Sequence, residues 1–116
     1  MRCANCPLPG RRAIHAAGPS SAEIVYIGEA PEEQEEKAGY PNAGWTGKKL
    51  DSLLAAAGLP HRHLSGEMNA ANCCQHYLGK EKKEEARKAC QGRLIEELEA
   101  RFPDCRIIVT MGAAAL

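Results

Sequence analysis

Three short apolar runs alternate along the chain with two longer stretches in which apolar residues recur at helical spacing. Residues 22–27 read AEIVYI, a run of β-forming residues between turn residues, and this pattern predicts a buried strand. A second strand is expected at residues 67–71, where the apolar signal is weak. A third is expected at residues 106–111 (RIIVTM), which Gly112 closes.

The first periodic stretch is TGKKLDSLLAAAGLP, and it predicts a helix. Its apolar residues share one face, at Leu50, Leu53, Leu54 and Ala57. We expect Thr46 to cap the N-terminus of this helix, and Gly58 with Pro60 to end it. A longer helix is predicted over residues 80–102, where an apolar stripe follows i, i+4 steps. That stripe consists of Ala86, Cys90, Leu94, Leu98 and Phe102, with Ile95 widening it.

The resulting order of strand, helix, strand, helix, strand predicts an α/β fold, a three-layer arrangement of a parallel sheet and flanking helices. Residues 28–44 are rich in glycine, proline and charge, so we expect a long loop there, where open α/β sheets bind ligands. Residues 1–116 are expected to form a single domain. Because the chain stops at GAAAL, within the first turn of another helix, we expect this domain to be incomplete.

Composition narrows the function classes. Hydrophobic residues make up 44% of the 116 positions, enough for one compact core. Lys plus Arg and Asp plus Glu both number 15, and a net charge of zero argues against sequence-independent wrapping of nucleic acid. An enzyme that grips a few nucleotides through local basic patches stays compatible. No apolar run is long enough to span a bilayer, and the N-terminus lacks a signal-peptide core, so we predict a cytoplasmic protein without a membrane partner.

Six cysteines are unusual for a protein of the reducing cytosol. Cys3 and Cys6 form a C-x2-C pair, and such a short loop can aim two sulfurs at one metal centre. Four more cysteines follow, at Cys73, Cys74, Cys90 and Cys105. The pattern indicates a metal or cluster site, and unrelated buried thiols are the alternative.

Six motifs follow one another in a recognisable order: CANCPL, AGPSSAEIVYIGEAP, GYPNAGWTGKKLDSLLAAAGL, MNAANC, ACQGRLIEEL and IIVTMG. Together they resemble the iron–sulfur (family 4) uracil-DNA glycosylases and their superfamily, from Cys3 to the last residue. The resemblance implies a four-stranded parallel sheet between helices, of which the last strand is missing here. It implies a base excision repair hydrolase that cleaves the N-glycosidic bond of a uracil flipped out of single- or double-stranded DNA. It also implies a structural 4Fe-4S cluster.

The family's cluster ligands map by this resemblance onto Cys3, Cys6, Cys73 and Cys90. Cys73 matches the family's Asn-x3-Cys step from Asn69, and Cys74 is the alternative. Zinc held by the same four cysteines is a second possible cofactor. Cys90 also suits a core position on the apolar stripe, since a cysteine behaves as a small hydrophobe. Cys105 has no family role, so we expect a buried thiol there.

The loop after the first strand forms the floor of the uracil pocket in this superfamily. By resemblance, the substrate-binding residues are Gly28, Glu29, Ala30, Asn42 and Asn69. Asn69 would hydrogen-bond the polar edge of uracil. Glu35 is the acidic water-activating position, and Glu29 is a second catalytic candidate. Without the resemblance, the stretch EEQEE reads as a solvated loop.

The chain departs from the family pattern at several positions. Glu32 stands where the family has a glycine, and Asn42 where a uracil-stacking phenylalanine is expected. Losing an aromatic platform costs roughly 1–3 kcal/mol of stacking. Tyr40 or Trp45 could replace it, or could pack the loop instead. CQH follows the third cysteine in place of an arginine and prolines.

The family's histidine-bearing loop would lie beyond Leu116. We expect the present histidines to be surface residues: His15, His61, His63 and His76. The stretch KEKKEEARK alternates basic and acidic residues, which favours a solvated, i,i+4-paired helix face over a phosphate contact. These departures leave a second interpretation open, a cluster-bearing module of the same fold that binds nucleic acid or a partner protein with little or no catalysis.

Overall fold

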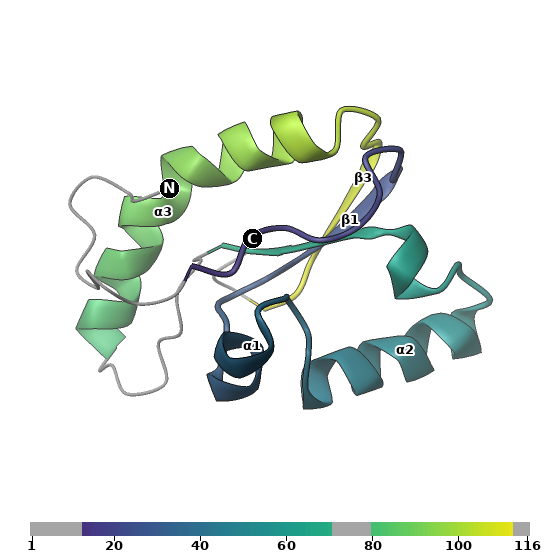
Figure 1. The fold of residues 1–116 in the computed structure, drawn as a ribbon, viewed down its shortest axis with the longest axis horizontal. Helices are drawn as coiled ribbons and strands as arrows, with labels where there is room; N and C mark the ends of the chain where they lie inside the picture. Colours follow the sequence, from purple (N-terminus) through teal and green to yellow (C-terminus); the bar gives the residue numbers. More distant parts are fainter. Residues whose placement is uncertain (1–12, 71–79, 113–116) are drawn as a thin grey trace.

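The structure is a computed structural model that describes residues 13–70 and 80–112 (Figure 1). Its sheet contains β1 (Ile24–Gly28), β2 (Gly66–Asn69) and β3 (Ile107–Thr110), in the order β2-β1-β3. Both pairings are parallel, and Val25 lies opposite Gly66 on one side and Ile108 on the other. The prediction of a parallel α/β sheet is confirmed, with each strand within two residues of its expected position at either end.

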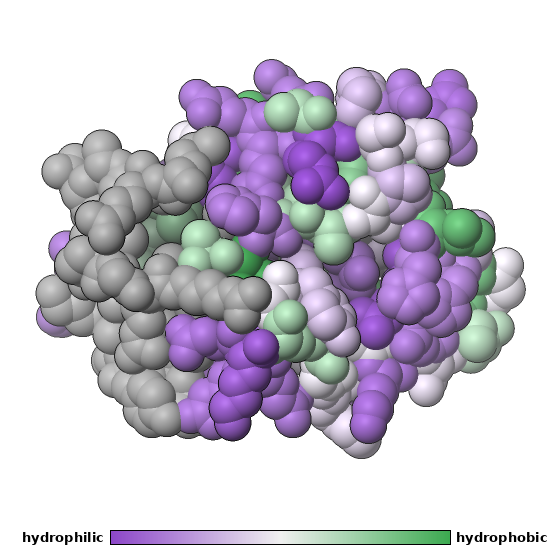
Figure 2. All heavy atoms as spheres, in the orientation of Figure 1, coloured by the Kyte–Doolittle hydropathy of each residue, from purple (hydrophilic) through white to green (hydrophobic). Residues whose placement is uncertain are grey.

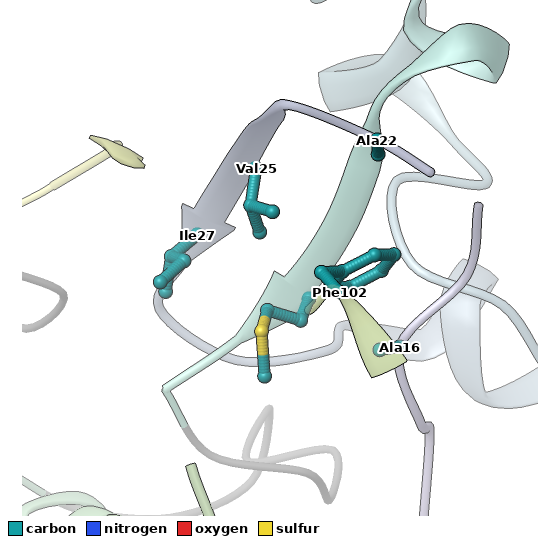
Figure 3. Close-up of a cluster of buried hydrophobic side chains, with 6 residues drawn as sticks. Ala16, Ala22, Val25, Ile27 and Phe102 are labelled. Carbon is teal, nitrogen blue, oxygen red and sulfur yellow. The ribbon is translucent and has the colours of Figure 1, made fainter. Parts of the chain in front are cut away.

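Helices cover both faces of the sheet, because β1 sends alternate side chains to opposite sides. Val25 and Ile27 pack with Met68 and with Phe102, the buried residue that follows α3 (Lys80–Arg101) (Figure 3). On the other face, Tyr26 packs with Leu50 and Leu54 of α2 (Trp45–Ala57). Figure 1 shows α3 on one side of the sheet and α1 and α2 on the other, so the three-layer prediction is confirmed.

The helix α2 begins two residues earlier than expected. Its N-cap is Gly44, so the prediction of Thr46 as the cap is wrong. Gly58 ends the helix in the left-handed conformation, with a φ of 69°, as the sequence predicted. A 3-10 turn, η1 (Arg62–Leu64), then leads into β2.

A short helix, α1 (Glu33–Ala38), lies inside the segment that we expected to be a loop. The backbone N–H of Glu32 donates to the Glu35 carboxylate (3.3 Å), which is the pattern of a capping box. Gly39 ends the helix with a φ of 89°, and its N–H donates to the Glu35 carbonyl. The expectation of a wholly irregular loop is therefore wrong, because acidic residues at the first turn favour a helix start.

The buried face of α3 differs from the predicted stripe at one point. Ala86 and Cys90 are buried as expected, but Ile95 is 54% exposed and Arg93 is buried in its place. On the outer face, Glu84 lies 3.7 Å from both Arg87 and Lys88, which confirms the paired, solvated surface expected there.

An N-terminal arm crosses the start of β2 before β1 begins. Ala17 and Glu67 exchange two backbone hydrogen bonds of 2.9 Å in an antiparallel bridge. In the part of the chain that is described, no helix combines the length and apolar character needed to cross a membrane, and the cytoplasmic location stays a prediction. Figure 2 shows apolar residues interspersed with polar ones on the face viewed.

Candidate active site

The carboxyl ends of the three strands meet at one edge of the sheet, where ligands bind in open α/β folds. The Ala70 N–H, after β2, donates to the Gly28 carbonyl (2.8 Å). The Met111 N–H, after β3, donates to the Ile27 carbonyl (2.8 Å). The edge therefore brings together three segments that lie far apart in the sequence.

Asn69 and Gly28 face each other at this edge. The Asn69 side chain is almost fully buried, at 4% exposure. A Cβ atom added at Gly28 would lie 2.8 Å from the Asn69 Oδ1 atom, closer than real Cβ contacts allow. Glycine at this position therefore makes room for the Asn69 amide, and two predicted substrate-binding residues are neighbours.

Glu29 projects from the same edge toward the end of β3. Its side chain is exposed, and a Cβ atom added at Gly112 would lie 2.5 Å from its Oε1 atom. Gly112 has a φ of 93°, which few other residues adopt. Sequence reasoning assigned Gly112 only to the end of a strand, and the structure adds it to the site. Ala30, next to Glu29, is partly buried.

Glu35 is held at the start of α1. The residue is 6% exposed, and its Oε2 atom accepts the Glu32 N–H at 3.3 Å. This bond fixes the position of the carboxylate relative to the loop that follows β1. The water-activating role of Glu35 stays a prediction.

Asn42 belongs to a buried polar cluster that sequence reasoning missed. It is 5% exposed with a φ of 55°, and its amide Nδ2 donates to Glu67 Oε1 at 3.0 Å. Arg62 donates to the Asn42 carbonyl (2.8 Å), to Glu67 (3.1 Å) and, through Nε, to Asp51 (2.8 Å). These contacts tie the α1–α2 loop to β2 and α2. A role for Asn42 in substrate binding stays a prediction.

The aromatic residues around Asn42 are exposed. Tyr40 is 48% and Trp45 is 74% exposed, so neither residue is buried. His15, His61 and His63 are also exposed, as expected, and His76 lies outside the described residues. Glu32, also exposed, is the N-cap of α1.

Arg93 of α3 holds the end of β2 in place through hydrogen bonds to its main chain. It is 5% exposed, and its Nη2 atom donates to the carbonyls of Asn69 (3.0 Å) and Ala70 (3.1 Å). Its Nη1 atom donates to Glu97 (2.7 Å), and Glu97 in turn accepts the Ala16 N–H (2.5 Å). The buried Nε atom of Arg93 has no hydrogen-bond partner among the described residues. Apolar periodicity gives no signal for such a residue.

Comparison with known proteins agrees with this geometry. A profile of the family described as the uracil DNA glycosylase superfamily matches residues 15–116. The chain belongs to the uracil DNA glycosylase superfamily. The resemblance of its motifs to that superfamily is therefore confirmed.

The superfamily relatives include several proteins named type-4 uracil-DNA glycosylase. The protein of Thermotoga maritima is 31% identical over 99% of this chain, which covers 59% of the relative. That of Archaeoglobus fulgidus is 32% identical over 99% of the chain and 57% of the relative. That of Sulfurisphaera tokodaii is 31% identical over 97% of the chain and 50% of the relative. The chain thus spans between half and three-fifths of the length of these curated relatives.

One of the four predicted cluster ligands lies in the described part of this superfamily member. Cys90 is 4% exposed on the inner face of α3. Cys3, Cys6 and Cys73, together with the alternative Cys74, lie outside the described residues, so the ligand set stays a prediction. Cys105 is half-buried and packs against the core beside α3.

The N-terminal arm lies along the second half of α3, and Cys90 lies at the middle of this helix. Gly18 accepts a hydrogen bond from Arg101, and Ala16 donates one to Glu97, one turn nearer the N-terminus of α3. Following the arm backward from Gly18 therefore leads toward Cys90. A buried thiol in that direction fits a centre whose other ligands come from the N-terminal segment. Among residues 13–70 and 80–112 there is no group of three or more potential metal ligands.

Proposed function

We propose that this chain provides the uracil-recognition side of a uracil-DNA glycosylase site, where water hydrolyses the N-glycosidic bond of a flipped uracil. The observation that carries the proposal is the edge contact between Gly28 and the buried side chain of Asn69. Membership of the superfamily supports it. Because the chain spans only part of its relatives' length, activity and substrate are proposals for this chain.

The proposed roles are those that the family resemblance implies, and most of the groups lie at the strand ends. Extruding a base costs a few kcal/mol, which hydrogen bonds to its polar edge recover, and the Asn69 amide is suited to supply them. Water adds to C1′ of the deoxyribose while the C1′–N1 bond breaks, and uracil leaves with the bonding electron pair. Glu35 accepts the proton of the water, and Glu29 orients that water. Backbone amides around Gly28 and Ala30 stabilise the charge that builds on the leaving base.

We further propose that Cys3, Cys6, Cys73 and Cys90 hold a 4Fe-4S cluster beside α3. Buried Cys90 and the direction of the N-terminal arm support this arrangement. Four thiolates from separate segments would fasten the arm to α3. Anaerobic purification and a visible absorption spectrum test it. A colourless protein that contains one zinc ion would contradict the cluster and favour zinc.

One observation favours a second function, a nucleic-acid-binding module without catalysis. The Asn42 side chain is buried and donates a hydrogen bond to Glu67. The position where the family has an aromatic residue therefore presents no exposed ring on which uracil could stack. Binding of uracil-containing DNA without release of the base would be the signature of such a module.

The deciding experiment is an excision assay on this chain. A single-stranded oligonucleotide with one uracil is incubated with the protein and treated with alkali, which cleaves at abasic sites. We expect cleavage at the uracil and none in a matched oligonucleotide with thymine there. An Asn69→Ala variant should lose most of the activity. Absence of cleavage with retained binding would leave the binding module, and absence of both would contradict both functions.

A further inference from the structure

A cleft lies beside the strand-end site, between α1 and the start of α2. It has a volume of about 510 Å³. Its lining residues are Gln34, Lys37, Ala38, Ala43, Gly44, Trp45 and Lys48. Only four residues separate β1 from α1, and Figure 1 shows α1 and the first turn of α2 close to the carboxyl ends of β1 and β3. The cleft is therefore a neighbour of the proposed uracil site.

The two walls of the cleft are joined by a direct contact. The Gln34 side-chain carbonyl accepts the Trp45 N–H at 3.2 Å, so α1 supports the first turn of α2. A Cβ atom at Gly44 would collide with the Gln34 side chain, so this approach depends on glycine. The cleft is thus built by specific packing between two helices.

Trp45 lines the cleft, and 74% of its surface is exposed. It is the one tryptophan of the chain. Tryptophan is a large aromatic residue that usually contributes to cores and interfaces, and an exposed ring that lines a cleft is accessible to a ligand. Nucleic-acid bases stack on such rings, and stacking is tolerant of base identity.

Positive charge flanks the aromatic ring on both walls. Lys37 lies in the last turn of α1, and Lys48 lies in the first turns of α2. The first turn of α2 carries no acidic residue, and the positive end of the helix dipole adds to the attraction for an anion there. The acidic residues of α1 are not among those that line the cleft. An aromatic ring and two lysines that line one cleft match a base and its phosphate.

We propose that this cleft binds a segment of single-stranded DNA, with one base stacked on Trp45 and a backbone phosphate between Lys37 and Lys48. The proposal rests on the proposed function, because it takes the strand that flanks the flipped uracil as the occupant. It adds a subsite that holds the strand through stacking and charge, independently of the uracil. Because the net charge of the chain is zero, attraction for phosphate depends on local contacts of this kind.

The test uses the fluorescence of Trp45, titrated with an oligothymidylate that contains no uracil. We expect saturable quenching that weakens as salt is raised. Trp45→Ala should weaken binding at least about fivefold, because stacking of one base is lost. The fluorescence anisotropy of a labelled oligonucleotide measures this loss of affinity. Trp45→Phe should retain part of the affinity, because phenylalanine keeps an aromatic face.

A matched pair of charge reversals isolates the phosphate contact. Lys48 lines the cleft, whereas Lys49, the next residue, is exposed and does not line it. Lys48→Glu should weaken binding several-fold, and the slope of the logarithm of the binding constant against the logarithm of the salt concentration should become less steep by about 1. Lys49→Glu makes the same change in net charge and should have a much smaller effect on both quantities. Equal losses in both variants would overturn the proposal, because they would reflect net charge alone.

Two further outcomes overturn the proposal without deciding the proposed function. Equal quenching by heparin, an anion without bases, would exclude stacking. Absence of quenching in a protein that still excises uracil would exclude the cleft as a DNA-binding subsite, while the proposed glycosylase activity would stand. Quenching in a protein that excises nothing would support the cleft and contradict only the glycosylase activity.

Discussion

The guanidinium of Arg93 donates to the main-chain carbonyl of Asn69 at 3.0 Å, from a residue 24 positions further along the chain. The same group reaches the Ala70 carbonyl (3.1 Å) and forms an ion pair with Glu97 at 2.7 Å. The side chains of Arg93 and Glu97 are 3% and 9% exposed. The end of β2, which presents the Asn69 amide to the site, is therefore anchored to α3 by a buried charge.

We expect Arg93→Met to destabilise the protein by about 3–5 kcal/mol, because it removes the 2.7 Å ion pair of the buried Glu97 carboxylate and the hydrogen bonds to two carbonyls. Arg93→Lys should cost less, since it keeps the charge but loses the fork of bonds to two carbonyls. Arg87→Met is the matched control, and its effect should stay within about 0.5 kcal/mol, because Arg87 is one-third exposed and its ion pair with Glu84 is 3.7 Å long. Urea unfolding measures all three. A loss below about 1 kcal/mol for Arg93→Met would show that the anchor carries little energy.

Such long-range contacts explain which parts of the fold could be predicted. Runs such as IVYI and RIIVT contain β-branched and aromatic residues, so the strands and their parallel order followed from local pattern. The helix α1 was missed because its sequence, EQEEKA, has no apolar period, and its start depends on the Glu32–Glu35 bond. Arg93 was missed because its partners are carbonyl groups of a distant strand, and side-chain periodicity carries no information about them.

Some residues of the candidate site could also be predicted from the sequence, and others could not. Gly28 and Asn69 were named from the motif resemblance, and the structure makes them neighbours. Arg62 and Glu67 were not named, because each reads locally as an ordinary surface charge. Their burial follows only from the folded chain, in which η1 delivers Arg62 to both Asn42 and Glu67.

The Asn42 position gives a direct test of this buried cluster. Asn42→Phe would restore the family's residue type, but we expect it to lower stability by at least about 2 kcal/mol. It removes a hydrogen bond to a buried carboxylate and places a bulky residue at positive φ. Asn42→Gly loses the same bond without the backbone strain, so it should be milder by about 1 kcal/mol or more. Thermal unfolding measures the difference. If Asn42→Phe is as stable as the parent and binds uracil-containing DNA more tightly, the side chain faces the pocket instead.

Substitutions of Glu35 can separate its structural role, in the capping box of α1, from its proposed role as the base that activates water. Glutamine also serves at the third position of a capping box, so Glu35→Gln should keep α1 intact. It removes the base, so excision of uracil should fall by roughly 100-fold or more. Glu35→Ala should lose both the activity and part of the stability, and Glu36→Gln is the control on the same helix. Excision rates and thermal unfolding are measured together. An unchanged rate in Glu35→Gln would remove Glu35 from the reaction.

Tyr26 predicts a pH dependence of stability on the alkaline side. Burial between the sheet and α2 raises the pKa of its phenol above the ordinary value of 10.0. The folded state therefore holds the phenolic proton more tightly than the unfolded state. The resulting stabilisation is complete below about pH 10 and is lost as pH rises through the raised pKa.

The comparison with Tyr26→Phe isolates this effect from other alkaline titrations. The difference in unfolding free energy between parent and variant should be constant from about pH 7 to about pH 9 and should change in favour of the variant above about pH 10. Urea unfolding at a series of pH values measures it. A difference that stays constant throughout would mean that the phenol is hydrated in the folded protein.

The strand β3 predicts self-association of this chain. In the described part it pairs only with β1, and Ile107, Ile108 and Val109 are 54%, 49% and 37% exposed. An edge strand with apolar side chains can pair with another chain, and a lysine on the edge blocks such pairing. We expect the parent chain to associate with rising concentration in analytical ultracentrifugation, and Ile108→Lys to suppress this. Leu53→Lys adds the same charge at a similarly exposed apolar residue of α2 (58% against 49% for Ile108), so it should suppress association much less. A monomeric parent, or equal suppression by the two variants, would exclude β3 as the associating surface.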